Sequence, residues 1–116
     1  MTRAQQKATD AVLSVIDVCH TLAELLPNTL TDFENDTRTQ WAVEMGLIRI
    51  GEGINRIPQE VLDRFDGQPW RQIIGMRNFA AHQYDDLDPK RVWRTVTQDI
   101  PLLRNYLEDV VLPSLA

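Results

Sequence analysis

The stretch TRTQWAVEMGLIRIGEGINRI, residues 37–57, decides the fold class, because its apolar residues recur with the period of an α-helix. Successive members of the main stripe are four, three, four and three residues apart, which keeps their side chains on one helix face. This stripe consists of Val43, Leu47, Ile50, Ile54 and Ile57. Trp41, Met45 and Ile48 widen it, so we expect this helix to be the central one of the fold.

Three glycines lie in the same segment. A glycine inside a helix costs about 1 kcal/mol relative to alanine, so Gly46, Gly51 and Gly53 need a compensating role. We expect them to allow close approach of the backbone of another helix. Glu52 lies between two of them, and we expect it to be solvated or structural, with a position facing a functional site as the alternative.

A helical pattern also precedes this stretch. Residues 2–26 are predicted to form an amphipathic helix. Its apolar stripe consists of Ala8, Val12, Val15, Cys19, Leu22 and Leu26. A capping-box pattern then occurs twice, at Thr31 with Glu34 and at Thr37 with Gln40, and either can begin the next helix.

The second half of the chain continues the helical period. Residues 59–65 indicate a short helical extension, and residues 70–82 indicate a third helix. A fourth helix is expected to begin at Asp88, an N-cap residue followed by a proline at the first helical position. Pro101 should kink this helix. Its apolar stripe consists of Trp93, Val96, Ile100, Leu103, Leu107 and Val110.

These segments together predict an all-α protein. None of them shows the sustained alternation of a β-strand. Four to five helices with short connections indicate an up-and-down helical bundle with antiparallel neighbours. The length is that of one domain, which we expect to span residues 1–116.

The composition excludes several classes of protein. Twelve Lys and Arg against seventeen Asp and Glu give a net charge of −5, which argues against a general nucleic-acid coat protein. A single cysteine excludes an internal disulfide, and together with only two histidines it excludes a Cys/His zinc site. No apolar run approaches the ~20 residues of a membrane span, and no signal peptide is visible, so we expect a soluble cytoplasmic protein.

The basic residues gather in one part of the chain. Residues 1–70 carry six basic and eleven acidic side chains, whereas residues 71–116 carry six of each. We therefore expect an anionic ligand to approach the second part. Five of its basic residues lie close together in sequence, namely Arg71, Arg77, Lys90, Arg91 and Arg94.

Few other residues are candidates for chemistry. Cys19 lies on an apolar stripe, so we expect a buried structural thiol. His20 has no polar partner nearby in sequence, so we expect a surface or packing residue. Asp85, Asp86 and Asp88 lack the spacing and the glycine of a calcium loop, so no metal site is expected there.

The segment RNFAAHQY, residues 77–84, gathers an arginine, an amide, an imidazole and a phenol. Arg77 can bind a phosphate in bidentate fashion, and His82 titrates near neutrality, as a general acid or base must. Asn78 lies four residues before His82 and can orient its ring. Arg77 and His82 are about 140° apart around an ideal helix, so either the helix unwinds or a second chain completes the site. The alternative is that both residues only complement the dipole of a helix end.

This segment resembles a known family. Arg77 and His82 match the R-x4-6-H motif of the HEPN superfamily, and the run to Tyr84 matches the narrower R-x4-H-x-Y form of its HepT-like toxins. Further segments resemble the family in the same order over roughly residues 31–110. They are IGEG at 50–53 (where the family has IGEA), PWRQIIGMRN at 69–78, VW at 92–93 and DIPL at 99–102.

The resemblance implies an all-helical homodimer that acts as a metal-independent endoribonuclease, needs no cofactor, and is the toxin of a type VII-like toxin–antitoxin pair. Arg77 and His82 would be the catalytic pair, and Asn78 and Arg71 would bind or orient the RNA substrate. Tyr84 would be the residue that an MntA-like nucleotidyltransferase antitoxin adenylylates to silence the toxin.

The residues also allow a different class of function. The chain can be a non-catalytic HEPN subunit that presents nucleotide or RNA to a partner nucleotidyltransferase. Arg77 would then bind phosphate, and His82 would only donate or accept a hydrogen bond. A purely structural dimeric bundle is the third alternative.

Overall fold

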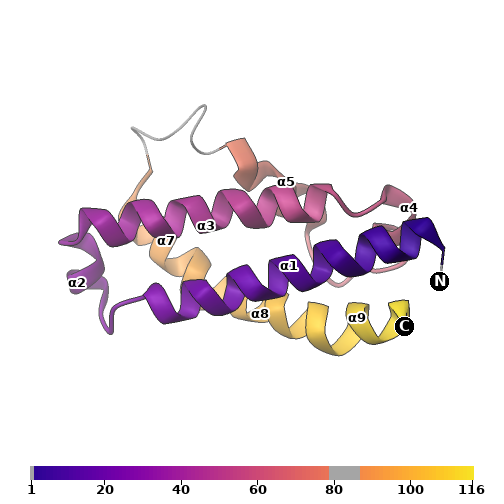
Figure 1. Ribbon diagram of the computed structural model, residues 1–116. Coiled ribbons are helices and arrows are strands. Elements are labelled where there is room, and N and C mark those ends of the chain that lie inside the picture. Colours follow the sequence, from indigo (N-terminus) through magenta and orange to yellow (C-terminus); the bar gives the residue numbers. More distant parts are fainter. Residues whose placement is uncertain (1, 79–86) are drawn as a thin grey trace.

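The computed structural model describes residues 2–78 and 87–116, and these form an all-α fold, as predicted (Figure 1). The first part of the chain comprises α1 (Arg3–Leu25), α2 (Leu30–Glu34), α3 (Thr37–Asn55), α4 (Gln59–Leu62), α5 (Trp70–Gly75) and the 3₁₀ turn η1 (Met76–Asn78). The last part is a continuous helical run of α7 (Pro89–Arg94), the π turn η2 (Thr95–Asp99), α8 (Ile100–Tyr106), the π turn η3 (Leu107–Val111) and α9 (Leu112–Leu115). The long helices α1 and α3 lie side by side in opposite directions, and α8 and α9 pack on α1.

Side-chain oxygens cap the first three helices. Thr2 caps α1 and forms a capping box with Gln5. Thr29 caps α2, and Asp36 caps α3. The Asp36 carboxylate accepts hydrogen bonds from the hydroxyl (2.6 Å) and the backbone nitrogen (3.1 Å) of Thr39. These hydrogen bonds lower the pKa of the Asp36 carboxyl, because they favour its charged form.

The two predicted capping boxes, which began at Thr31 and Thr37, are therefore wrong. The actual caps lie two residues and one residue earlier, where an extended backbone conformation allows an oxygen to reach the free N–H groups of the first turn. Gln40 was expected to close the second box. Its amide donates instead to the carbonyl oxygens of Phe33 (2.8 Å) and Glu34 (3.0 Å), which ties α2 to the start of α3.

Helix α3 packs against α1, α2, α5 and η1, which confirms its predicted central position. All five residues of its predicted apolar stripe are buried. The widening of this stripe is wrong, because the side chains of Trp41 and Met45 are 70% and 50% exposed and Ile48 is only half-buried. These residues lie on the side of α3 that faces away from the core, where no other described element covers them.

The glycines of α3 adjoin two different elements. A Cβ atom on Gly46 or Gly53 would meet the side chain of Leu22 or Val15 on α1, so the predicted approach of another backbone is wrong for these two positions. The prediction is confirmed at Gly51. A Cβ there would lie 2.6 Å from the backbone nitrogen of Arg77. Only a glycine at this position lets η1 lie directly on α3.

The buried residues of the last helical run differ at two positions from the predicted apolar stripe. Its buried residues are Val92, Val96, Ile100, Leu103, Leu107, Val111 and Leu115, mostly four residues apart. Trp93 and Val110, which were predicted to belong to this face, are half-buried and 40% exposed. Val96, Ile100, Leu103 and Leu107 are buried as predicted. Val110 lies inside the π turn η3, where an i→i+5 hydrogen bond adds a residue to the turn, and Val111 takes the buried position in its place.

The π turns also show how the chain accommodates proline. Pro101 and Pro113 each follow one π turn, at the second residue after it. Proline lacks the N–H group of an α-helical turn and collides with the carbonyl group four residues earlier. A kink was predicted at Pro101, and the structure shows a local widening of the helix just before the proline.

Replacement of Gly51 by alanine should destabilise the fold by about 1–3 kcal/mol, because the new methyl group would overlap backbone atoms that no side-chain rotation can move. Gly75→Ala is the matched control, because a Cβ there meets no atom within 4 Å. It should raise the free energy of unfolding by about 0.5–1 kcal/mol through helix propensity. Urea unfolding followed by circular dichroism measures both changes. Equal stability of the two variants would contradict the close contact of η1 with α3.

Candidate active site

Arg77 and Asn78 belong to η1, a 3₁₀ turn that follows α5, and both side chains are exposed. The predicted third helix over residues 70–82 is present as α5 and continues through Met76–Asn78 as a tighter 3₁₀ turn. The angle of Arg77 relative to His82 consequently does not follow from an ideal α-helix. His82 and Tyr84, with the rest of 79–86, lie outside the described residues.

The backbone of η1 rests on the C-terminal half of α3. Three backbone atoms crowd the place of a Gly51 side chain, namely the nitrogen of Arg77 and the carbonyl oxygens of Ile73 and Ile74. Ile73 and Met76 are buried on the inner side of the same segment. Arg77 therefore has an anchored backbone and an exposed guanidinium, which suits a residue that binds an incoming anion.

The start of α5 is held in place by contacts with the loop before it and with α8. The indole nitrogen of Trp70 donates a hydrogen bond of 2.6 Å to the carbonyl oxygen of Phe65, and the Trp70 ring packs 6.0 Å from that of Tyr106 on α8. The Tyr106 hydroxyl accepts a hydrogen bond of 3.1 Å from the backbone nitrogen of Gly67. These contacts join the loop before α5 to α8, so the position of η1 depends on both α3 and the last helical run.

A cleft of about 460 Å³ lies between α5–η1 and the last helical run. Its apolar part is formed by Ile73, Met76, Ile100, Leu102 and Leu103. Polar groups surround this part, and they are Gln68, Gln72, Arg91, Thr95 and Asp99. The volume of the cleft is within the usual range for small-ligand sites. Met76, which lines the cleft, directly precedes Arg77 in the chain.

The exposed cations of the second part of the chain lie on three elements. Arg71, Arg77, Lys90, Arg91 and Arg94 are all exposed, on α5, η1 and α7. Arg91 lines the cleft, whereas Arg71, which was predicted to bind substrate, does not. The sequence did not identify Gln72 and Arg91 as cleft residues. They come from two segments, α5 and the last helical run, that lie against each other only in the folded chain.

The acidic residues of α3 near this site are few. Glu52 is exposed, in agreement with a solvated role. Glu44 lies seven residues before Gly51 and therefore on nearly the same helix face. Burial raises the pKa of the Glu44 carboxyl, because a charged carboxylate is less stable out of water.

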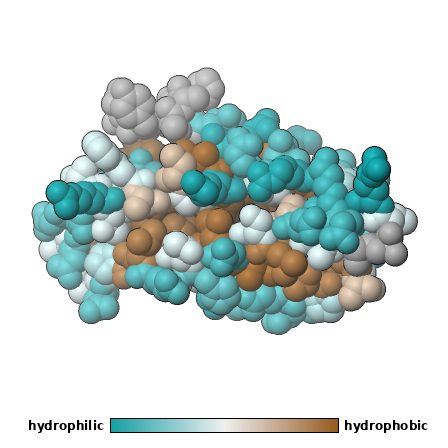
Figure 2. All heavy atoms as spheres, viewed as in Figure 1, coloured by the Kyte–Doolittle hydropathy of each residue, from teal (hydrophilic) through white to brown (hydrophobic). Residues whose placement is uncertain are grey.

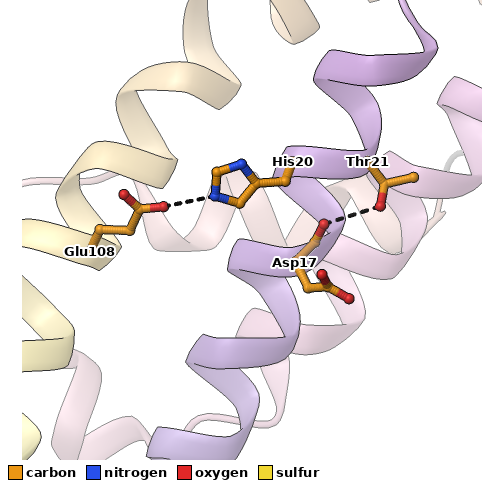
Figure 3. A network of polar contacts seen from close by, with 4 residues as sticks. All are labelled: Asp17, His20, Thr21 and Glu108. Atoms are coloured by element: carbon orange, nitrogen blue, oxygen red, sulfur yellow. Dashed lines mark hydrogen bonds and ion pairs between the residues drawn. The ribbon is translucent and has the colours of Figure 1, made fainter.

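His20 is a surface residue, as predicted, and its role is that of an ion-pair partner. Its Nε2 atom lies 3.0 Å from the Oε1 atom of Glu108, which joins α1 to η3 (Figure 3). Neither element belongs to the region around Arg77. The partner is 88 residues away in sequence, so only the tertiary structure reveals it.

Cys19 is buried on the apolar face of α1, as predicted. Burial raises the pKa of its thiol to about 12, and the charge of Arg104 opposes this effect to a smaller degree. The thiol is therefore neither ionised nor accessible near neutral pH, which is inconsistent with a nucleophile.

Two further findings concern the part of the chain that the structure describes. No three His, Cys, Asp or Glu side chains there come together in a way that could hold a metal ion. No helix among these residues is both long and apolar enough to cross a membrane.

Comparison with known proteins identifies the family. The model of the family "Ribonuclease HepT-like" matches residues 15–110, a range that includes the Arg77–Tyr84 segment. "Probable ribonuclease HepT" of Thermococcus cleftensis is 38% identical over 77 residues, which are 66% of this chain and 70% of the relative. "Putative RNase MJ1216" of Methanocaldococcus jannaschii is 30% identical over 80 residues, 69% and 66% of the two chains. No solved structure matches this chain.

The chain therefore belongs to the ribonuclease HepT-like family, which confirms the resemblance inferred from the motifs. The family is one of ribonucleases, so the predicted class of enzyme is confirmed at that level.

The burial of Cys19 predicts its reactivity. With a pKa of about 12, on the order of 1 in 10⁴ of the thiol groups is ionised at pH 8. The native protein should therefore react with a thiol reagent such as DTNB far more slowly than the urea-unfolded protein at the same pH. Comparable rates in the two states would contradict the packing of α1 against the last helical run.

Proposed function

We propose that this chain is a metal-independent endoribonuclease in which Arg77 and His82 form the catalytic pair. The main support is the position of Arg77, an exposed guanidinium on a turn whose backbone is wedged against Gly51. The family match over residues 15–110 supports the same reaction class, because it contains the complete R-x4-H-x-Y segment.

The proposed reaction uses the RNA's own 2′-hydroxyl as nucleophile. His82 accepts the 2′-hydroxyl proton as the 2′-oxygen bonds to the adjacent phosphorus, a contribution of about 10²–10⁴-fold. The bond from phosphorus to the 5′-oxygen breaks, which leaves a 2′,3′-cyclic phosphate and a 5′-hydroxyl that takes up a proton. Arg77 stabilises the additional negative charge on the phosphate oxygens in the transition state.

The surroundings of Arg77 suit an RNA strand. The net charge of the whole chain is −5, yet the exposed side chains on α5, η1 and α7 include five cations. Such a local cluster can attract phosphates although the molecule as a whole repels them. Arg71 on α5 and Asn78 on η1 are exposed and are proposed to bind or orient the RNA. Arg91 is an exposed cation that lines the cleft.

We propose further that the enzyme is the toxin of a toxin–antitoxin pair and works as a homodimer. The partner would be an MntA-like nucleotidyltransferase that transfers adenylate to Tyr84. An adenylate two residues from His82 would add negative charge and a bulky base close to Arg77, where an RNA phosphate would otherwise bind.

A non-catalytic subunit that binds nucleotide or RNA for a partner transferase is the competing function. It uses the same cations, so binding measurements do not separate it from a nuclease. Only cleavage by the purified protein distinguishes the two.

Arg77→Ala and His82→Ala should each lower RNA cleavage in the presence of EDTA by about 10²-fold or more. The thermal unfolding midpoint of the Arg77 variant should stay close to that of the wild type, because its side chain is exposed. Arg3→Ala, which removes an exposed guanidinium on α1, is the matched control and should cleave normally. Cleavage that persists in the His82 variant would refute the catalytic pair, and a wild type without activity would favour the binding subunit.

Co-expression with the cognate nucleotidyltransferase should add one or more AMP units to Tyr84, detectable by intact-mass analysis and peptide mapping. The modified protein should no longer cleave RNA, because the adenylate excludes the substrate phosphate from Arg77. Tyr84→Phe should remain an active nuclease and escape silencing. A wild-type protein without an adduct, or with the adduct at another residue, would refute this regulation but leave the nuclease proposal intact.

A further inference from the structure

The cleft beside Met76 is lined by two segments that are distant in sequence. The first segment, α5 with η1, contributes Gln72 and Met76. The second, the last helical run, contributes Arg91, Thr95 and Asp99, which are four residues apart. Residues four apart lie on nearly the same face of a helix, so these three form one polar row along the cleft.

The cleft also has apolar walls. Ile73, Met76 and Leu103 are buried there, whereas Leu102 lines the cleft with 62% of its surface exposed. Apolar walls with a few polar groups are typical of sites that bind a small organic group. A flat nucleobase suits such walls, because it can pack between apolar side chains while its edge forms hydrogen bonds.

The polar row carries two opposite charges. Arg91 and Asp99 are eight residues apart, about 12 Å along the helix axis. Both side chains are exposed, and the structure shows no ion pair of either with another described residue. The cleft therefore presents a donor of hydrogen bonds and an acceptor of hydrogen bonds about two helical turns apart.

These two charged groups discriminate among the four bases of RNA. A carboxylate only accepts hydrogen bonds, and its two oxygens require two adjacent donors. Guanine alone has such a pair, N1–H and the N2 amino group. Adenine and cytosine place a ring acceptor beside their amino group, and the N3–H of uracil lies between two carbonyl groups. The O6 and N7 atoms of guanine are also the preferred acceptors for an arginine.

The cleft adjoins the proposed phosphate site. Met76 lines the cleft, and Arg77 is the next residue in the chain, with its Cα atom about 3.8 Å from that of Met76. The base and the phosphates of a nucleotide are attached to the same ribose. A strand whose phosphate lies at Arg77 can therefore place the base of a flanking nucleotide in the cleft.

We propose that the cleft binds a guanine that flanks the cleaved phosphate of a single-stranded RNA. Asp99 accepts hydrogen bonds from N1–H and the N2 amino group, and Arg91 donates to O6 and N7. The proposal deepens the proposed function, because it rests on RNA as the substrate and names the base that is selected. It also explains an acidic residue in an RNA-binding cleft, since a carboxylate rejects bases that cannot donate to both of its oxygens.

Exchange of the carboxylate for an amide tests the assignment of Asp99. The probe is a short RNA of uridines with one central base varied, fully 2′-O-methylated so that no 2′-hydroxyl can attack, and its binding is measured by fluorescence polarisation. The wild type should bind the guanine RNA about tenfold more tightly than the other three. Asp99→Asn should prefer adenine instead, because an asparagine amide both donates to N7 and accepts from N6 of adenine.

Asp109→Asn is the matched control for this exchange. Asp109 is an exposed carboxylate on η3, in the same helical run, and it does not line the cleft. The control variant should keep the guanine preference. A structural role of Asp99 alone would weaken the binding of all four RNAs and would not change the preferred base.

Removal of the cation tests Arg91. Arg91→Ala should weaken the binding of the guanine RNA about tenfold more than that of the other three, because only guanine offers it the O6 and N7 pair. Arg94→Ala removes the same charge from α7 at an exposed position outside the cleft. It should weaken all four RNAs to a similar extent, because its attraction concerns the phosphates.

Equal binding of the four RNAs by the wild type, a guanine preference that persists in Asp99→Asn, or an equal effect of Arg91→Ala on all four RNAs would each overturn the proposed base site. These outcomes are separate from the nuclease assay, because the probe cannot be cleaved. A protein that cleaves RNA through His82 but binds all bases equally retains the proposed function and loses the base site. A protein that selects guanine without cleaving RNA retains the base site and loses the nuclease.

Discussion

The contact between Gly51 and the backbone of η1 is the constraint on which the candidate site depends. A Cβ atom at this position would lie 2.6 Å from the nitrogen of Arg77 and 3.0 Å from the carbonyl oxygen of Ile73. The absence of a side chain lets a short helix and a 3₁₀ turn lie directly on α3, at a cost in helix propensity that packing must offset. Arg77 then extends from a backbone that is fixed on its inner side.

The rest of the structure holds this contact from two directions. Helix α3 is positioned by α1 through the close fit of Gly46 and Gly53 against Leu22 and Val15. The loop before α5 is held by Trp70 and by Tyr106, which lies on the last helical run. The first support is packing between helices, and the second is a pair of side-chain hydrogen bonds to the backbone of the loop before α5. Figure 2 shows that hydrophobic residues gather along the middle of the face that it draws.

The cleft and the uncovered side of α3 differ in the residues that they expose. The cleft beside Met76 combines an apolar wall with Arg91, Gln72 and Asp99, whereas the uncovered side of α3 exposes Trp41 and Met45. The proposed binding of phosphates concerns the first surface, because Arg91 lines it and Arg77 follows Met76 in the chain.

The sequence determined the fold class, the apolar face of each long helix and the family, because these follow from period, caps and motifs that are local in the chain. The start of the last helix at Asp88 is an example, since its cap acts within two residues. The tertiary structure alone decided which glycine adjoins a backbone, the pairing of His20 with Glu108, and the exposure of Trp41. It also decided that Val111 and not Val110 is buried at the second π turn, which a regular period cannot indicate. These features depend on which elements meet in space, and residues 39 or 88 positions apart carry no local sign of their contact.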